Sequence, residues 1–441
     1  MTKTFYAILA NTLVASLTNT FVWFAVTFWV YLQTENVMAM SVMAGIYLIT
    51  VTVSGFFLGS LVDRYKKKTV MLLSSLGSLG LYVLAYSLFV STDPEMFTNP
   101  ASLQLWGFIL LTLVGAIAGN LRTIALPTIV TLLIPEPRRA QANGLVGTVN
   151  GVSFLVASIF SGLVIGFLGI YWMLVLAICL TLLIIVHLST IAISEAKIIQ
   201  TESSASHIDI RGTIQAIHLV PGLFGLIFFN TFNNFLGGVF MALMDAYGLS
   251  LVSVQAWGIL WGFLSLGFIV GGLVVARKGL GKSPLKTLFL ANIVMWIVAI
   301  FFTMRASIIL LAIGVFIYLC LIPVVEAAEQ TILQTVIPLE RQGRVFGFAQ
   351  SIEQAASPLT AFMIGPIAQF IFIPFMTTGA GVDLLGPWFG SGSDRGIALL
   401  FTVTGIIGLL VTVMAMRSRA YRALSAKYHT LGRCIRSIPN G

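Results

Sequence analysis

The sequence predicts an all-α membrane protein with 12 transmembrane helices in two pseudo-symmetric six-helix bundles. Three observations predict this fold class. The composition is 58% hydrophobic and 9% charged, with a mean hydropathy of +1.01, whereas soluble domains carry about 25% charged residues. Apolar stretches long enough to cross a bilayer, roughly 20 residues each, recur along the whole chain. The apolar stretches in the second half of the chain repeat short sequence patterns of those in the first half.

High hydropathy places six spans in each half of the chain. Those of the first half are expected at Phe5–Leu32, Ser41–Val62, Val70–Val90, Leu103–Ile134, Ala142–Leu168 and Tyr171–Ile193. Those of the second half are expected at Gly222–Met244, Val254–Ala276, Leu285–Met304, Ile308–Ile337, Val345–Phe375 and Ile397–Met416. The expected domains are an N-terminal bundle (1–194), a cytoplasmic linker (195–220), a C-terminal bundle (221–417) and a basic cytoplasmic tail (418–441).

The basic residues gather on one side of the predicted spans. With the N-terminus inside, most of the 24 lysines and arginines fall in the even-numbered connections and the terminal segments. Arg122, Arg305 and Arg395 are the exceptions. This asymmetry follows the positive-inside rule, so both termini are expected in the cytoplasm. It also explains the net charge of +9 by topology rather than by a nucleic-acid-binding surface.

Cysteine and histidine usage gives no sign of a disulfide framework or a metal site. The three cysteines, Cys179, Cys320 and Cys434, lie far apart, and the four histidines are scattered. No glycine-rich phosphate loop is present, so ATP is not the expected energy source. The first span lacks a cleavage signal and is expected to be retained. No cofactor or metal is expected, and a proton gradient is the expected driving force.

Three patterns recur in the two halves at equivalent places. Gly55–Val62 matches Gly267–Val274, Leu133–Pro135 with Arg138 matches Val336–Pro338 with Arg341, and Asn11-Thr12 matches Asn230-Thr231. Two halves that share the same orientation in the membrane are related by an axis along the membrane normal. This arrangement predicts a substrate site between them near the midplane. The repeat therefore favours a carrier over a channel or a membrane enzyme.

The segment Gly59–Lys68 reads GSLVDRYKKK and resembles the conserved loop of the major facilitator superfamily, G-x-L-x-D-R-x-G-R-[RK]. Lys66 stands where the family has glycine. Within the superfamily, this segment together with Leu133–Glu136 and Gln330–Phe346 resembles the bacterial drug:proton antiporter branch that contains the macrolide-efflux proteins.

The resemblance assigns a conformational role to four residues of the loop, namely Gly59, Asp63, Arg64 and Lys67. Gly59 allows close helix approach. Asp63 is expected to meet a helix N-terminus or an arginine of the other half. Val275 replaces the aspartate in the second half, so this latch is expected on one side only.

Charged side chains within apolar spans are costly and mark candidate functional sites. Glu326 and Glu329 lie in the tenth predicted span, with Gln330 on the same helix face, and Glu353 lies in the eleventh. A carboxylate inside the bilayer can bind and release protons as access alternates, so the three glutamates are candidate proton-coupling residues. The alternative is a structural salt bridge that only holds helices together.

Arg122 lies in the fourth predicted span at a depth that the repeat makes comparable to Glu326. The resemblance implies that spans one, four, seven and ten line a central cavity, so Arg122 is expected to face Glu326 or Glu329. The amides that share these spans are the other candidates for the cavity: Asn11, Asn19, Asn230, Asn234 and Gln330. Hydrogen bonding between helices accounts for these amides equally well.

The expected function is proton-coupled efflux of amphipathic small molecules such as drugs, by alternating access. We expect a monomer in the bacterial inner membrane whose partners are its substrate, protons and lipids, with no nucleic acid. A dedicated exporter of a metabolite, siderophore or lipid is the alternative. A membrane-embedded enzyme would need a nucleophile–base or metal constellation, and none is evident.

Overall fold

A computed structural model describes residues 2–34, 37–193 and 210–436. The described residues form helices and connections, without strands. They divide into two compact units that do not follow a single cut in the sequence. Unit 1 consists of Met1–Ala142, Val149–Thr213 and Pro338–Ser351, and unit 2 consists of Asn143–Thr148, Ile214–Ile337 and Ile352–Gly441. A short part of the helix α6 (Glu136–Phe167) thus belongs to unit 2, and the start of the helix α13 (Leu339–Ile367) belongs to unit 1.

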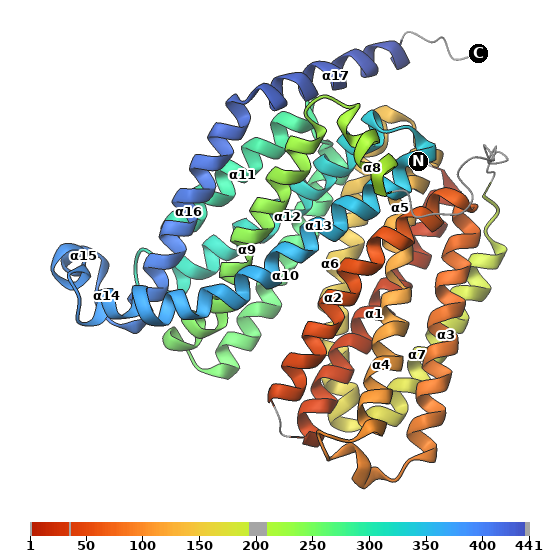
Figure 1. The fold of residues 1–441 in the computed structure, drawn as a ribbon, viewed down its shortest axis with the longest axis horizontal. Coiled ribbons are helices and arrows are strands. Elements are labelled where there is room, and N and C mark those ends of the chain that lie inside the picture. Colours follow the sequence, from red (N-terminus) through yellow and green to blue (C-terminus); the bar gives the residue numbers. More distant parts are fainter. Residues whose placement is uncertain (1, 35–36, 194–209, 437–441) are drawn as a thin grey trace. The chain divides into compact units, whose positions relative to one another are not determined.

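Unit 1 contains the long helices of the first half of the chain (Figure 1). Its elements are α1 (Lys3–Thr34), α2 (Val37–Arg64), α3 (Lys67–Ser91), the 3-10 turn η1 (Pro94–Phe97), α4 (Leu103–Ala118), α5 (Asn120–Leu133), α6 (Glu136–Phe167) and α7 (Gly169–Thr190). An aromatic cluster of Trp29, Phe89, Phe97 and Phe108 fills its core near one end of these helices.

Unit 2 contains the helices of the second half, joined by α8, which begins in the last residues of unit 1. The elements are α8 (Ile210–His218), α9 (Leu223–Leu251), α10 (Val254–Lys278), α11 (Pro284–Phe301), α12 (Ile308–Val336), α13 (Leu339–Ile367), the π-helical segment η3 (Ala368–Phe372), α14 (Ile373–Thr377), α15 (Gly381–Phe389), α16 (Ser393–Arg417) and α17 (Arg419–Arg436). Phe240 lies at the centre of its aromatic core, against Trp296, Phe302 and Phe401.

All twelve predicted spans coincide with helices to within several residues. Eleven helical stretches of the described residues are long and apolar enough to cross a membrane. The remaining predicted span, Ser41–Val62, lies within the 28-residue helix α2. Serine side chains begin several of these helices by accepting a backbone N–H from the residue three positions ahead: Ser102, Ser253, Ser283 and Ser307.

The structure adds detail that hydropathy alone does not give. The fourth predicted span is two helices, α4 and α5, which meet at Gly119 beside the side chain of Asn19. The eleventh begins earlier than predicted, at Leu339, and passes into the π-helical segment at Ala368, two residues after Pro366. The predicted linker lies partly outside the described residues and otherwise contains α8. The described part of the basic tail forms the helix α17.

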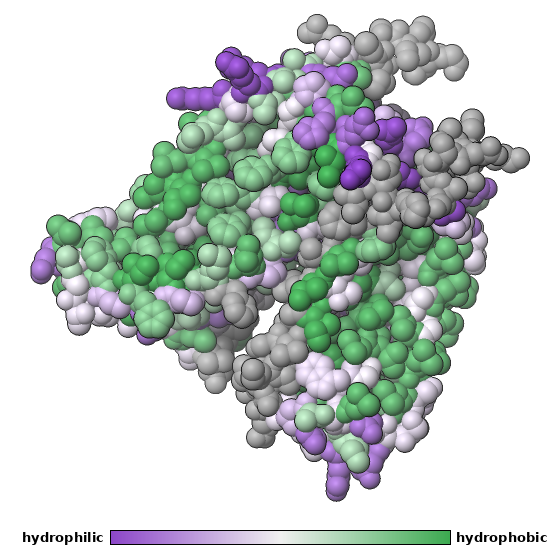
Figure 2. All heavy atoms as spheres, viewed as in Figure 1, coloured by the Kyte–Doolittle hydropathy of each residue, from purple (hydrophilic) through white to green (hydrophobic). Residues whose placement is uncertain are grey.

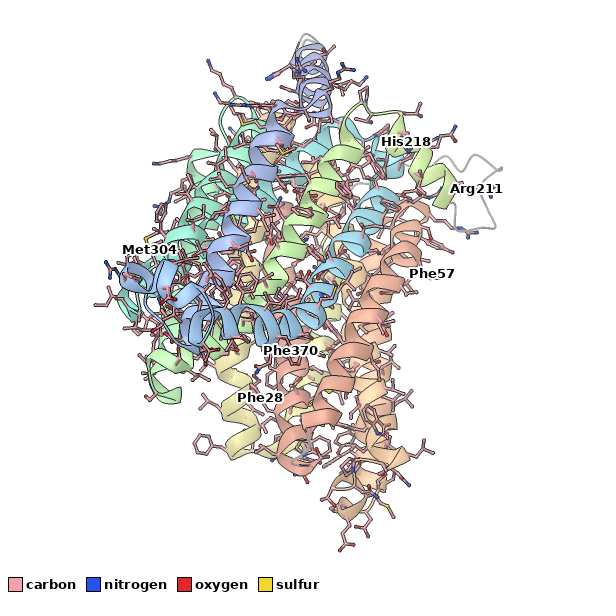
Figure 3. All side chains as sticks on the ribbon, turned by 60° about the vertical axis from the view of Figure 1, so that its left-hand side comes forward. Phe28, Phe57, Arg211, His218, Met304 and Phe370 are labelled. Carbon is pink, nitrogen blue, oxygen red and sulfur yellow. The ribbon has the colours of Figure 1, made fainter. Side chains whose placement is uncertain are left out.

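Apolar side chains cover the flanks of the long helices in each unit, and polar side chains gather at helix ends (Figure 2). Phe28, Phe57 and Phe370 point outward from their helices, and Phe370 is 77% exposed (Figure 3). Such exposure of large apolar side chains is expected for helices whose surroundings are lipid. Arg211 and His218, by contrast, lie on the short helix α8.

Candidate functional site

Three carboxylates from two helices gather inside unit 2. Glu329 of α12 lies within hydrogen-bonding reach of Glu353 of α13 and of Asn230 of α9. Glu326 is close enough to both glutamates for electrostatic repulsion. We call Glu326, Glu329, Glu353 and Asn230 the carboxylate cluster. Three of the candidates predicted from the tenth and eleventh spans are therefore neighbours, together with one of the predicted amides.

The carboxylate cluster is partly buried and incompletely hydrogen-bonded. Glu329 and Asn230 are buried, Glu353 is half-buried and Glu326 is exposed. Among the described residues, three buried side-chain atoms in and beside the cluster have no aligned hydrogen-bond partner: Glu353 Oε1, Asn230 Nδ2 and Gln330 Oε1. Buried polar atoms are nearly always satisfied, so atoms left open in this way indicate a place where a proton, water or ligand is exchanged.

Packing between α9 and α13 brings the cluster together. The hydroxyl of Ser357 donates to the backbone oxygen of Asn234 at 2.8 Å. Asn230 lies one turn before Asn234 on α9, and Glu353 lies one turn before Ser357 on α13, so this contact holds the two side by side. Asn234 thus contributes its backbone to the positioning of the cluster.

Arg122 lies at the centre of a different network, inside unit 1. Its guanidinium donates to Asn11 Oδ1 at 2.6 Å and to Ser75 Oγ at 3.1 Å. Asn11 Nδ2 donates in turn to the backbone oxygen of Ile184 at 2.9 Å and lies 3.2 Å from His187 Nδ1. Helices α1, α3, α5 and α7 each supply a member. We call Arg122, Asn11, Ser75 and His187 the arginine network.

The arginine network adds two residues to those predicted from the sequence. Within unit 1, the hydrogen bonds of Arg122 go to the neutral acceptors Asn11 and Ser75, which reach the guanidinium from adjacent helices. The approach of Arg122 to Glu326 or Glu329, which lie in unit 2, stays a prediction. Arg122 is 3% exposed, so the network encloses it. Ser75 and His187 were not singled out from the sequence, because a serine and a terminal histidine carry no distinctive signal there.

Asp63, from the recognised loop, binds the start of α13 within unit 1. Its Oδ1 accepts the backbone N–H of Gly343 at 2.6 Å, and its Oδ2 accepts that of Arg344 at 2.9 Å. Arg344 Nε lies 3.8 Å from Oδ2. Asp63 therefore meets both the backbone near a helix N-terminus and an arginine of the second half of the sequence, as predicted. The backbone bonds are short, whereas the ion pair is loose.

Glycines allow α2 and α13 to approach closely at this point. A Cβ on Gly59 would lie 2.5 Å from the backbone oxygen of Gly343, and a Cβ on Gly343 would lie 2.5 Å from Asp63 Oδ1. Gly55 and Gly347 continue the same contact one turn away. The spacing Gly55–Gly59 and Gly343–Gly347 is the small-residue spacing that lets helix backbones touch.

Unit 2 contains the corresponding contact between α6 and α10, without the aspartate. A Cβ on Gly144 would lie 2.5 Å from the backbone nitrogen of Ala276 and 2.8 Å from the Cβ of Val275. Val275 is buried, so an apolar side chain occupies the place that Asp63 has in unit 1. Asn143, the residue before Gly144, donates to Thr331 Oγ1 at 2.9 Å and to Gln334 Oε1 at 3.0 Å.

The remaining predicted residues have mainly local contacts. Lys67 is buried and its Nζ donates to the backbone oxygen of Val62 at 2.7 Å, at the end of α2, where a cation is favoured. Arg64 is exposed. Asn19 is half-buried, and its Oδ1 accepts from the Tyr82 hydroxyl at 3.4 Å.

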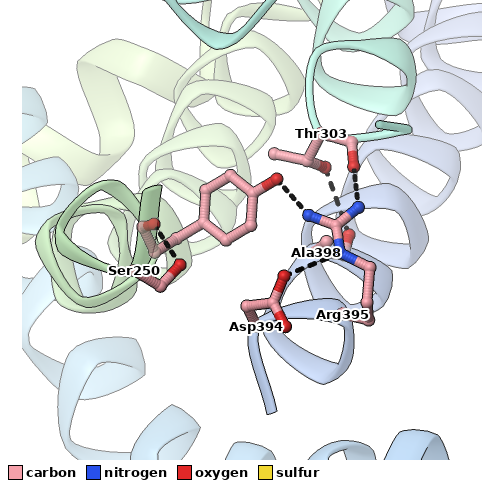
Figure 4. Close-up of polar contacts among 6 residues, drawn as sticks. Ser250, Thr303, Asp394, Arg395 and Ala398 are labelled. Carbon is pink, nitrogen blue, oxygen red and sulfur yellow. Dashed lines mark hydrogen bonds and ion pairs between the residues drawn. The ribbon is translucent and has the colours of Figure 1, made fainter. Parts of the chain in front are cut away.

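One buried arginine has a structural role that the sequence did not reveal. Arg395 bonds Asp394 Oδ2 at 2.9 Å, the backbone oxygen of Thr303 at 3.0 Å and the hydroxyl of Tyr247 (Figure 4). Its guanidinium also lies over the ring of Phe389 at 5.5 Å. These contacts join α9, α15, α16 and the segment that follows α11 at one end of unit 2.

Comparison with known proteins agrees with this architecture. The family model of the Major Facilitator Superfamily matches residues 8–361. The chain is 24% identical to "Macrolide efflux protein A" of Streptococcus pyogenes over 371 residues, which cover 80% of this chain and 87% of that protein.

Solved structures of transporters have a similar fold. One is a bacterial homologue of the iron transporter ferroportin in its outward-facing state, with a TM-score of 0.70 at 13% identity, covering 95% of this chain and 100% of the other. Another is the proton:xylose symporter XylE bound to 6-bromo-6-deoxy-D-glucose, with a TM-score of 0.66 at 13% identity, covering 93% and 95%. The chain is therefore a multi-pass membrane transporter, and it belongs to the major facilitator superfamily.

Proposed function

We propose that this transporter exports amphipathic small molecules in exchange for protons, and that the carboxylate cluster carries the proton. The observation that carries the proposal is the meeting of Glu329, Glu353 and Asn230 inside a bundle of apolar helices, with polar atoms left unpaired. The direction of transport is supported by the similarity to a macrolide efflux protein.

The chemistry of the cluster suits proton exchange. Two adjacent carboxylates repel each other when both are ionised, so a proton shared between them is favoured. Asn230 can donate to an ionised carboxylate or leave it, because its amide has no locked partner. The exposed Glu326 provides a third acceptor beside the pair, and through it a proton can enter or leave. Alternating access then exposes this group to each side of the membrane in turn.

Transport in proteoliposomes tests the proposal. Purified protein is reconstituted, a pH gradient is imposed, and accumulation is measured for a panel of macrolides, lipophilic cations and neutral amphipathic compounds. We expect at least one compound to accumulate against its gradient, and a protonophore to abolish the accumulation. Equal accumulation with and without the pH gradient, for every transported compound, would show that protons do not drive this protein.

We also propose that the protein lies in a bacterial cytoplasmic membrane with both termini inside, as the distribution of basic residues predicts. A variant that keeps Cys434 and replaces Cys179 and Cys320 by serine tests the orientation. Its thiol should resist a membrane-impermeant maleimide in intact cells and react after lysis. Ready labelling in intact cells would contradict a cytoplasmic C-terminus.

A further inference from the structure

A second carboxylate of unit 2 lies outside the carboxylate cluster and has an unusual setting. Asp245 lies on α9, six residues before the helix ends at Leu251, and its side chain is exposed. Its Oδ1 accepts the indole N–H of Trp257 at 2.9 Å and that of Trp261 at 3.2 Å. Both donors go to the same oxygen, so Oδ2 is left without a hydrogen-bond donor among the described residues. Two tryptophans thus orient the carboxylate and leave half of it open.

The surrounding fold holds the two indoles in place. Ser253 caps the start of α10, which places Trp257 and Trp261 one turn apart on the same helix face. Their rings meet edge to face at 5.9 Å. The ring of Trp257 lies directly against Gly248 of α9, where a Cβ would collide with it. Because Trp257 is buried and Trp261 half-buried, the arrangement is fixed on one side and accessible on the other.

The negative charge of Asp245 is not neutralised by the described residues. No lysine, arginine or histidine among them forms an ion pair with it. Arg395, the buried cation at this end of unit 2, is occupied by Asp394, Thr303 and Tyr247 (Figure 4). The exposed carboxylate therefore has no cation of the described residues paired with it, and its open oxygen can pair with a cation from outside.

The chemistry of the group selects one class of ligand. An organic ammonium group can pair with a carboxylate and also lie over the accessible face of a nearby indole, and tryptophan gives the strongest cation–π interaction. A metal ion would need further oxygen, nitrogen or sulfur ligands, and the described residues contain no group of three or more such side chains that could hold one. The ligand is therefore an organic cation with an apolar body, which can also contact the aromatic ring of Trp261.

We propose that Asp245, Trp257 and Trp261 form a recognition site for the cationic group of an amphipathic substrate. This inference rests on the proposed export function and adds that protonated or quaternary amines are the preferred substrates. The site lies entirely within unit 2, and the tryptophans act by orienting the carboxylate and by stacking on the cation.

Binding of two probes that differ in charge tests the inference. Tetraphenylphosphonium is a permanent lipophilic cation, and triphenylphosphine oxide is a neutral compound of related shape. Equilibrium dialysis against the purified protein should show that Asp245→Asn weakens tetraphenylphosphonium binding about tenfold or more. Binding of triphenylphosphine oxide should stay within about twofold. Asp383→Asn is the matched control, because it removes the same charge from the exposed residue Asp383 of α15, and it should bind both probes normally.

Two further variants keep the test decisive if the Asp245→Asn protein cannot be produced in folded form. Trp261→Phe keeps an aromatic ring at this position but loses the indole N–H, so it should weaken tetraphenylphosphonium binding by about threefold. Trp257→Phe should do the same.

Unchanged cation binding in these variants, or no binding of the cation to the wild-type protein, would overturn the inference. Proton-driven accumulation of neutral compounds would still stand as separate evidence for the proposed function.

Discussion

Each unit buries charge inside apolar helices, but the two units surround that charge differently. In unit 1, Arg122 is enclosed by Asn11 and Ser75, whose oxygens face its guanidinium at hydrogen-bonding distance. In unit 2, Glu329 and Glu353 lie beside each other and beside Asn230, and buried oxygen and nitrogen atoms of this group lack aligned partners. The first arrangement is closed and the second is open.

Under the proposed function, this difference separates a structural charge in unit 1 from an exchangeable charge in unit 2. An arginine keeps its proton under all physiological conditions, and neutral acceptors on two neighbouring helices give it a fixed place. Carboxylates change charge when a proton arrives, and an incompletely satisfied group accommodates both states. The proposed function therefore places proton exchange in unit 2 and gives the arginine network of unit 1 a role in helix positioning.

The largest effect is expected from neutralising the carboxylate pair. Glu329→Gln and Glu353→Gln each keep the side-chain shape but cannot exchange a proton, so uphill transport should fall to the level seen without a pH gradient. Downhill exchange of substrate should continue. Accumulation in reconstituted vesicles measures uphill transport, and counterflow of labelled substrate measures downhill exchange. Glu95→Gln, in the exposed η1 segment, is the control. Uphill transport at the wild-type rate in both variants and in their combination would move the coupling role elsewhere.

A third buried charge, Asp63, should affect the speed of the cycle rather than its coupling. Asp63→Asn keeps one acceptor oxygen but loses the charged bonds to Gly343 and Arg344. We expect turnover to fall about tenfold, since a hydrogen bond to a charged group contributes about 1.5–3 kcal/mol. Substrate affinity should stay near normal.

Arg344→Gln is the comparison for Asp63→Asn. The ion pair is long and partly exposed, so its loss should change turnover by less than about threefold. An equal loss in the two variants would mean that the ion pair, and not the backbone contact, holds α2 to α13.

Removing the cation of unit 1 should destabilise the protein without uncoupling it. Arg122→Ala leaves the buried oxygens of Asn11 and Ser75 without this donor, which we expect to lower stability by about 1–3 kcal/mol. Thermal unfolding monitored by fluorescence-detected chromatography measures the change. In the fraction that remains folded, a pH gradient should still drive uphill transport of the substrate as fully as in the wild-type protein. Loss of this uphill transport in folded protein would give Arg122 a direct part in coupling.

The smallest effect is expected at the outer edge of the arginine network. His187 is exposed and its ring contacts only the amide of Asn11 within that network, at 3.2 Å. His187→Ala should therefore change stability by less than about 0.5 kcal/mol and leave transport unaltered. Asn11→Ala provides the contrast, because it removes the acceptor that lies closest to Arg122, and its effect should approach that of Arg122→Ala. If His187→Ala shifted the pH dependence of transport, this histidine would take part in proton movement.

The helices and the charged candidates could be predicted from the sequence because both depend on local signals. Long apolar stretches predict the helices, and a glutamate or arginine within such a stretch is conspicuous. Asp63 was found through its loop pattern, and the same pattern predicted contact with a helix N-terminus or an arginine of the second half. The arrangement of partners could not be predicted, because Asn11, Ser75 and His187 meet only after four helices pack.

The two glycine contacts illustrate the same limit. The repeat aligned Asp63 with Val275 and predicted a latch on one side, and the structure has that asymmetry. It did not indicate that Asn143 would bind Thr331 and Gln334 near the second contact, because an amide on α6 carries no information about which helix lies opposite. The open polar atoms of the carboxylate cluster are likewise a property of packing and not of residue type.

Substrate-induced proton release tests the central assignment most directly. Purified protein in weakly buffered detergent solution is mixed with a transported compound, and a pH indicator records the protons released. Wild-type protein and Arg122→Ala should release protons on binding, whereas Glu329→Gln and Glu353→Gln should release none while still binding the compound. Release at the wild-type level from the two glutamine variants, or its loss from folded Arg122→Ala alone, would contradict the assignment of the exchangeable proton to the carboxylate cluster.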